Sequence, residues 1–453
     1  MLRLLPSASG APNRTPSASE GLFASPWHLL GQSLALPVLL GGLSLCPCFV
    51  LAEDPPLPNP DKPVDYVAWI NAQYSKGIKE NAAEVYREAL DAFVEDKQAL
   101  ELATRWDPPW RDYERRKLQR WLDKNERCLE RFAAAAQMRD CYFEFQSETG
   151  SAFEVGLPMM KPLRDVSRML AARARLRLAH GETEAAVEDI VTLVCAGRHL
   201  ESQPYLIGYL VGVSVRATAY GLLIRFPQVA SGEVDYDAVL RSLRRVDRVP
   251  RSPKKQLGVE RITYLDALQR YCKDDDGDGR LDKLDIPTLE SVEFARPETI
   301  ETLIAECDRF LERWYEVLSS DYSTGKRLAQ ELRQDLKAQG RAPVCVLLAG
   351  FWGSMRMYRQ LVAERGGARI VLRIHAFKAE HGHWPKGLKE TGTSASIRRD
   401  PFSGQEFVYR LKDGEPLLYS VGENGIDDGG KPAEDGKQWS PTGDAILWPP
   451  TEK

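Results

Sequence analysis

Apolar side chains recur at steps of three and four residues through most of the chain between residues 64 and 380. This spacing puts them on one face of an α-helix. Proline pairs such as Pro108-Pro109 and turns such as residues 180–183 interrupt the pattern, because proline and glycine disfavour a continuing helix. The pattern therefore predicts a mainly α protein built from many helices, several of them paired as helical hairpins.

The interruptions divide the pattern into expected helical segments. Two of these segments, 64–93 and 163–200, are each expected to form a helix, a turn and a second helix. Single helices are expected over the ranges 111–143, 204–226, 235–248, 257–272, 287–319, 324–339 and 356–380.

The second hairpin resembles one tetratricopeptide unit in its small and apolar positions. These positions are Ala171, Ala174, Leu178, Gly181, Ala185, Ala186 and Leu193. An ordinary helical hairpin explains the same positions, and a repeat array needs at least three stacked units. The sequence therefore predicts hairpins and leaves the repeat interpretation open.

The segment at 204–226 is the most apolar part of the chain after the N-terminal region, and it is long enough to suggest a membrane span. Arg216 lies in its middle, with Ser214, Thr218 and Tyr220 nearby. Charged residues are costly inside a bilayer. We therefore expect a buried helix and no membrane span in the mature chain.

An acidic run, Asp274 to Asp285, reads DDDGDGRLDKLD and is the one stretch whose residue types and spacing indicate a chemistry. Calcium takes six to eight oxygen ligands, and a twelve-residue loop supplies them from alternate positions. Counting from Asp274, the candidate ligands are Asp274, Asp276, Asp278, the carbonyl of Arg280, Asp282 and Asp285. Gly279 occupies position six, where the loop turns sharply.

This run resembles an EF-hand calcium loop, and the resemblance implies a structural Ca²⁺ ion as the cofactor. Position twelve is Asp285 rather than a glutamate, which predicts weak affinity or a better fit to magnesium. Pro287 follows closely, so the helix leaving the loop is expected to be short or to restart at Thr288. The alternative is a solvated acidic turn that binds no ion.

After Trp384-Pro385 the pattern changes to short strand-like segments separated by turns. The strings D-P-F-S-G-x-x-F-V-Y and L-Y-S-V-G-x-N-G-x-D-D-G-G resemble the C-terminal module of the major pseudopilins of type II secretion. The resemblance implies a helix packed on a small antiparallel sheet, with a calcium-holding loop after the last strand. The positions that match this loop are Glu423, Asn424, Asp427 and Asp428, with Asp435 and Asp444 as further candidates.

The first 52 residues have the pattern of a signal peptide. An apolar stretch from about Leu34 to Leu51 ends in Val50-Leu51-Ala52, which a signal peptidase would read. Residues 53–63 then form a Pro-rich linker, followed by a helical domain over 64–340 and a pseudopilin-like part over 341–453. We expect an exported protein of the periplasm or cell envelope, anchored at its N-terminus if the leader is not cleaved.

The 453-residue chain carries a net charge of −4, which gives no reason to expect a nucleic-acid partner. It contains no G-x-S-x-G, H-E-x-x-H or G-x-x-x-x-G-K-[ST] motif, so no catalytic residue is assigned. We expect a non-enzymatic, calcium-binding scaffold or binding protein with a protein partner in the envelope. The alternatives are an envelope enzyme without a recognisable motif and an accessory component of a type II secretion or pilus-like system. No prepilin cleavage site precedes Arg356, so a filament subunit is not expected.

Overall fold

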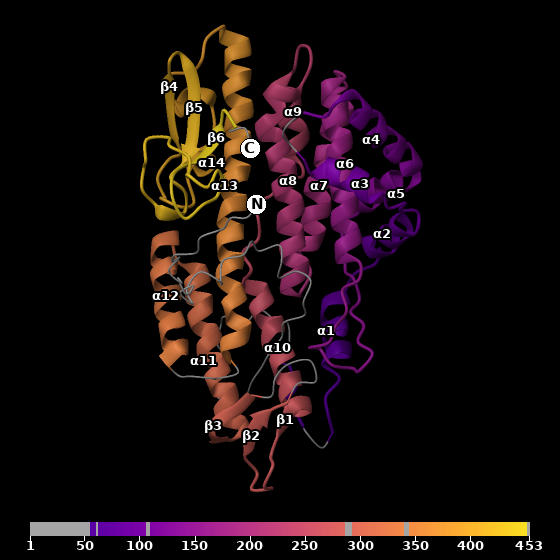
Figure 1. The fold of residues 1–453 in the computed structure, drawn as a ribbon, viewed down its shortest axis with the longest axis vertical. Helices are drawn as coiled ribbons and strands as arrows, with labels where there is room; N and C mark the ends of the chain where they lie inside the picture. The colour runs from indigo at the N-terminus through magenta and orange to yellow at the C-terminus, as the bar shows by residue number, and fades with distance from the viewer. Residues whose placement is uncertain (1–54, 60–61, 106–108, 286–291, 339–343, 451–453) are drawn as a thin grey trace, which may run out of the picture. The chain divides into compact units, whose positions relative to one another are not determined.

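The computed structural model describes residues 55–59, 62–105, 109–285, 292–338 and 344–450 (Figure 1). Within these residues it contains fourteen α-helices and two three-stranded antiparallel sheets. This confirms the expected fold class, a mainly α protein with a small α+β module near the C-terminus. The expected signal peptide lies outside the described residues.

The helices before the acidic run are α1 (Tyr66–Ser75), α2 (Ala82–Asp91), α3 (Lys97–Thr104), α4 (Asp112–Lys124), α5 (Glu126–Gln137), α6 (Met160–Ala179), α7 (Thr183–Glu201), α8 (Leu206–Val229), α9 (Tyr236–Arg244) and α10 (Lys254–Tyr271). Those after it are α11 (Ile300–Ser319), α12 (Tyr322–Ala338), α13 (Val344–His381) and α14 (Ala395–Arg398). The strands are β1 (Cys272–Lys273), β2 (Leu281–Leu284), β3 (Val292–Glu298), β4 (Val408–Lys412), β5 (Glu415–Ser420) and β6 (Ala445–Trp448).

Both predicted helix-turn-helix segments are present, as α1 with α2 and α6 with α7, and of these α6 and α7 pack against each other as a hairpin, whereas α1 contacts α10 and α2 contacts α5. The single helix expected over 111–143 is wrong, because α4 and α5 are separate helices that meet at Asn125. The Asn125 side chain accepts a hydrogen bond from the N–H of Val94 (2.8 Å) and donates to the carbonyls of Val94 (3.1 Å) and Trp121 (2.9 Å). A buried asparagine that bonds the backbone in this way competes with the helical hydrogen bonds and ends α4.

The helix expected over 287–319 is only partly correct. Residues 292–298 form β3, which pairs antiparallel with β2, and the helix begins at Ile300. Thr299 caps it, because its hydroxyl accepts a hydrogen bond from the N–H of Thr302 (3.3 Å). Pro287 and Thr288 lie outside the described residues. Residues 292–298 therefore form a strand that pairs with β2, although their apolar spacing predicted a helix.

The most apolar helix, α8, packs against α6, α7 and α13. It meets the length and composition of a membrane span, and 67% of its most apolar stretch is buried within the protein. Arg216 on α8 is fully buried and donates to both carboxylate oxygens of Glu201 on α7 (2.9 and 2.7 Å). Two glycines let α7 and α8 approach closely, because a Cβ on Gly212 would lie 2.6 Å from the carbonyl oxygen of Gly197.

The helix expected over 356–380 is the C-terminal part of a longer helix of 38 residues, α13, which begins at Val344. This helix contacts α8 and α9 and also the C-terminal strands β5 and β6. Two adjacent glycines let α13 pack closely on the C-terminal module. A Cβ on Gly366 would lie 2.9 Å from the Phe407 ring, and a Cβ on Gly367 would lie 2.8 Å from the Leu447 side chain. The domain boundary expected at 340 falls in residues 339–343, outside the described residues.

The C-terminal sheet has the strand order β4-β5-β6. Its D-P-F-S-G turn is fastened to the end of β5 by Asp400, which is buried. The Asp400 carboxylate accepts hydrogen bonds from the Ser420 hydroxyl (2.9 Å) and from the N–H of Val421 (3.1 Å). Ser420 is thereby engaged in a structural contact.

Candidate metal centre

The acidic run forms the tip of a β-hairpin that follows directly from α10. Strand β1 pairs antiparallel with β2, with Cys272 opposite Leu284 and Lys273 opposite Lys283. The loop between the two strands covers residues 274–280 and projects beyond the end of α10 (Figure 1). All seven of these loop residues are exposed.

Three of the predicted ligands come together at this tip. Carboxylate oxygens of Asp274, Asp276 and Asp282 lie within 4.8 Å of one another. This is the one such group of acidic, histidine or cysteine side chains found in the described part of the chain. Asp278 and Asp285 do not belong to the group.

Hydrogen bonds inside the loop hold Asp274 in place. Its carboxylate accepts from the N–H of Gly277 (2.6 Å) and from the N–H of Gly279 (2.9 Å). The hydrogen bond from Gly279 is the main reason why the pKa of Asp274 lies below its ordinary value. Both glycines have the left-handed backbone that the loop needs, with φ of 77° and 84°. The carboxylate is therefore kept ionised and fixed at the mouth of the loop.

Other carboxylates of the acidic run also accept hydrogen bonds from backbone N–H groups. Asp282 accepts from the N–H of Asp275 (2.8 Å), which joins the two sides of the hairpin. Asp278 accepts from the N–H of Arg280 (2.8 Å), so its side chain bonds the loop backbone two residues further along the chain. Asp275 itself pairs with Lys283 (2.7 Å) and takes no part in the cluster.

Asp285 lies further from the hairpin tip than the three clustered aspartates. Its N–H donates to the carbonyl of Tyr271 (2.8 Å), so it stands opposite a residue three positions before Asp274. Three residues of strand span about 10 Å. The chain leaves the loop as strand β2, whereas an EF-hand leaves it as a helix that carries the twelfth ligand toward the ion.

The donor set of the cluster suits a hard cation. Three carboxylates supply oxygen atoms only, and calcium and magnesium prefer oxygen ligands. Three carboxylates leave much of a six- to eight-oxygen shell to backbone carbonyls, such as that of Arg280, and to water. The residues present therefore fit a weakly held, partly hydrated calcium ion.

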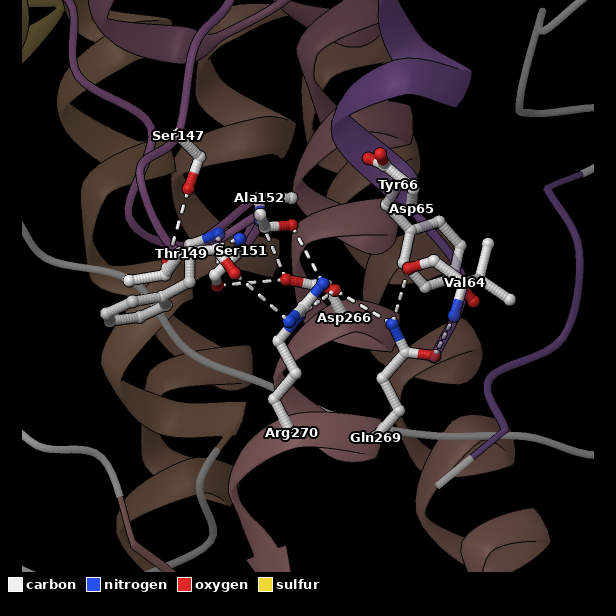
Figure 2. A network of polar contacts seen from close by, with 12 residues as sticks. Val64, Asp65, Tyr66, Ser147, Thr149, Ser151, Ala152, Asp266, Gln269 and Arg270 are labelled. Carbon is white, nitrogen blue, oxygen red and sulfur yellow. Dashed lines mark hydrogen bonds and ion pairs between the residues drawn. The ribbon is translucent and has the colours of Figure 1, made fainter. Parts of the chain in front are cut away.

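A buried polar network holds the base of the hairpin (Figure 2). Asp266 on α10 is fully buried and accepts from the Ser151 hydroxyl (2.9 Å) and the N–H of Ala152 (2.7 Å). It also accepts from Gln269 (2.9 Å) and Arg270 (2.8 Å), three and four residues further along α10. Helical spacing predicts the pair with Arg270, but nothing local in the sequence indicates the loop at 147–153 as a partner.

Gln269 extends this network to the N-terminal linker. Its side-chain oxygen accepts from the N–H of Val64 (2.9 Å), and its nitrogen donates to the carbonyl of Val64 (2.8 Å) (Figure 2). Two chain segments, 147–153 and the residues before α1, are thus fastened to the last two turns of α10. The hairpin therefore projects from a fixed base.

The second predicted set of ligands, in the C-terminal module, is only partly brought together. Glu423 is buried and turned toward α13, where it accepts from Gln360 (2.8 Å), and burial raises its pKa. Asn424 donates to Asp428 (2.8 Å). Asp427 accepts from the Tyr419 hydroxyl (2.8 Å), which lowers the pKa of Asp427.

Asp444 is the strongest candidate in this second region. It is 2% exposed, and one carboxylate oxygen accepts from the N–H of Gly430 (2.7 Å). The other oxygen is buried and has no hydrogen-bond partner. Burial raises the pKa of Asp444, and the nearby carboxylates of Asp427 and Asp428 raise it further. The carboxylates of Asp444, Asp427 and Asp428 do not form a second close group like that at the hairpin tip, which is the one such group in the described residues. Asp435, by contrast, pairs with Lys437 (3.2 Å).

Comparison with known proteins adds no relative to this geometry. No protein-family model, no curated protein and no solved structure matches this chain.

Proposed function

We propose that this protein binds calcium at the tip of the β1–β2 hairpin and serves as a non-enzymatic, calcium-stabilised scaffold or binding protein. The observation that carries the proposal is the approach of the Asp274, Asp276 and Asp282 carboxylates to within 4.8 Å of one another. Three like charges held this close repel one another, and a divalent cation removes that repulsion. Export to the cell envelope, suggested by the N-terminal pattern, completes the proposal.

The ion has a structural role in this proposal. Because the loop is exposed, we expect it to bind calcium as weakly as extracellular calcium-binding modules do, with Kd on the order of 10⁻⁴–10⁻³ M. An ion at Asp274 and Asp282 joins the two strands of the hairpin, next to the hydrogen bond from Asp275. The region around Asp444 is a second, independent calcium site in the same proposal, supported by its unpartnered oxygen.

Thermal unfolding of the full chain with calcium and with a chelator tests the proposal. A ligand that binds only the folded state at about ten times its Kd stabilises it by about 1.4 kcal/mol. We expect calcium to raise the unfolding temperature of the natural chain and to raise it less in the double variant Asp276→Asn, Asp282→Asn.

The control is Asp275→Asn, which removes one charge from the same loop but belongs to the ion pair with Lys283. It should respond to calcium as the natural chain does. If calcium leaves the unfolding temperature of the natural chain unchanged at millimolar concentration, both acidic regions are solvated turns and the proposal is wrong.

A further inference from the structure

A groove of about 960 Å³ is lined by residues of the helical part of the protein, and none of its lining residues belongs to either acidic loop. Helix α7 contacts both α5 and α9, and residues of all three helices line the groove. Arg173 and Arg177 of α6 also reach its lining.

Part of the lining of the groove is apolar. Helix α5 contributes Leu129 and Ala133, which are four residues apart and so lie on one face. Helix α7 contributes Val187 and Val191 with the same spacing, and α9 contributes Ala238. The alanines on α5 and α9 leave room for side chains of an occupant.

The rim of the groove is acidic. Five exposed glutamates line it, and none of them has an ion-pair partner in the part of the chain that the structure describes. They are Glu126, Glu130, Glu184, Glu188 and Glu233. Two pairs, on α5 and on α7, are each four residues apart, about one helical turn.

The two arginines in the lining offset only part of this charge. Arg173 donates to both carboxylate oxygens of the buried Asp189 (3.1 and 2.6 Å), and Arg177 donates to the same carboxylate (2.9 Å). Two guanidinium cations against one carboxylate leave one net positive charge, so the five glutamates keep the lining of the groove net negative.

We propose that this groove docks a basic amphipathic helix of a partner protein. An amphipathic helix lays an apolar stripe into an apolar groove, and its flanking residues meet the rim. Lysines or arginines four residues apart on the partner match the glutamates four residues apart on α5 and α7. A phosphate-bearing partner is disfavoured, because the rim repels anions. This inference does not depend on calcium binding.

Binding of a labelled synthetic peptide to the full chain, followed by fluorescence anisotropy, tests the inference. The probe is a helical peptide of about 18 residues with leucine and alanine on one face and lysine beside it. A matched peptide carries glutamate in place of lysine. We expect the lysine peptide to bind, with an affinity that falls as salt increases, and the glutamate peptide not to bind.

Two variants separate docking in the groove from general attraction to an acidic protein. Glu130→Lys with Glu188→Lys reverses charge on both walls, and we expect it to weaken binding at least about tenfold. The control, Glu80→Lys with Glu148→Lys, makes the same charge change at exposed acids outside the groove and should weaken binding less than about threefold.

A third variant, Ala134→Trp, fills the groove without changing charge, because Ala134 is an exposed member of its lining. It should also weaken binding of the lysine peptide at least about tenfold. Circular dichroism confirms that each variant is folded before its binding is compared. Equal losses in the groove and control variants, or unchanged binding in Ala134→Trp, would overturn the inference.

Discussion

The N–H of Asp285 donates to the carbonyl of Tyr271 at 2.8 Å, and this hydrogen bond pairs Asp285 with Tyr271 across the acidic hairpin. Asp285 is the twelfth residue of the run and would supply the closing carboxylate of an EF-hand. In the hairpin it lies at the far end of the strand from Asp274. The acidic run therefore has the ligand spacing of an EF-hand in a different backbone.

Removal of the Asp285 carboxylate should leave calcium binding nearly unchanged. We expect Asp285→Ala to change Kd less than about twofold, because the side chain stands about 10 Å from the cluster. Asp276→Ala should raise Kd at least about tenfold, because it removes one of three clustered carboxylates. Calcium titration calorimetry on both variants checks this. The reverse order of the two effects would mean that the loop closes as an EF-hand when calcium binds.

Alanine substitutions at two glycines of α8 should change the free energy of unfolding in opposite directions. A Cβ on Gly212 would lie 2.3 Å from the backbone nitrogen of Glu201, so Gly212→Ala must push α7 and α8 apart. We expect it to lower the free energy of unfolding by about 2–4 kcal/mol. Gly221 has no atom within 4 Å of such a Cβ, so Gly221→Ala should raise it by up to about 1 kcal/mol. Urea unfolding measures both, and similar effects at the two sites would contradict the close packing.

His199 should make the protein more stable at neutral than at acid pH. It is buried between α2 and the end of α5, with ring contacts to the Tyr86 hydroxyl and the Met138 carbonyl (both 3.1 Å). Burial lowers the pKa of His199 from 6.5 to about 4. The unfolded chain therefore binds more protons between these values, and the free energy of unfolding rises with pH from about 4 to 6.5.

The measurement is urea unfolding of the natural chain and of His199→Gln across this pH range. Other groups titrate as well, so the test is the difference between the two proteins. The stability advantage of the natural chain should fall by about 2–3 kcal/mol on going to the acid end. A difference independent of pH would show that His199 contributes packing alone.

Asp444→Asn should have opposite effects with and without calcium. Without calcium, the amide should stabilise the fold by about 1 kcal/mol, because burial disfavours the carboxylate charge and raises the pKa of Asp444. With calcium, the variant should lose the stabilisation that an ion at the second region provides. Thermal unfolding in calcium and in chelator gives both values. Asp435→Asn, at a carboxylate paired with Lys437, is the control. An unchanged calcium response in Asp444→Asn would remove this region from the proposal.

The helical spacing of apolar residues predicted most of the fold. It placed the turn of the α6–α7 hairpin correctly, because that spacing and the glycine at 181 are local features. It missed the break at Asn125, which depends on Val94 from another segment. It also missed β3, because the pairing with β2 joins residues that no local pattern connects.

The candidate site was also predictable only in part. Alternating aspartates and a glycine at position six indicated a loop that gathers oxygens, and the structure brings Asp274, Asp276 and Asp282 together. The strand that leaves the loop, and with it the position of Asp285, follows from pairing across the hairpin. The acidic groove was not predictable, because its walls come from α5, α7 and α9, which are separate in sequence.

Calorimetric titration of calcium into the chelator-treated full chain tests the central claim most directly. The proposal predicts saturable binding with Kd on the order of 10⁻⁴–10⁻³ M. It also predicts that Asp276→Asn with Asp282→Asn loses one bound ion, while Asp275→Asn keeps it. Binding that is absent in the natural chain, or unchanged in the double variant, would contradict a calcium site at the hairpin tip.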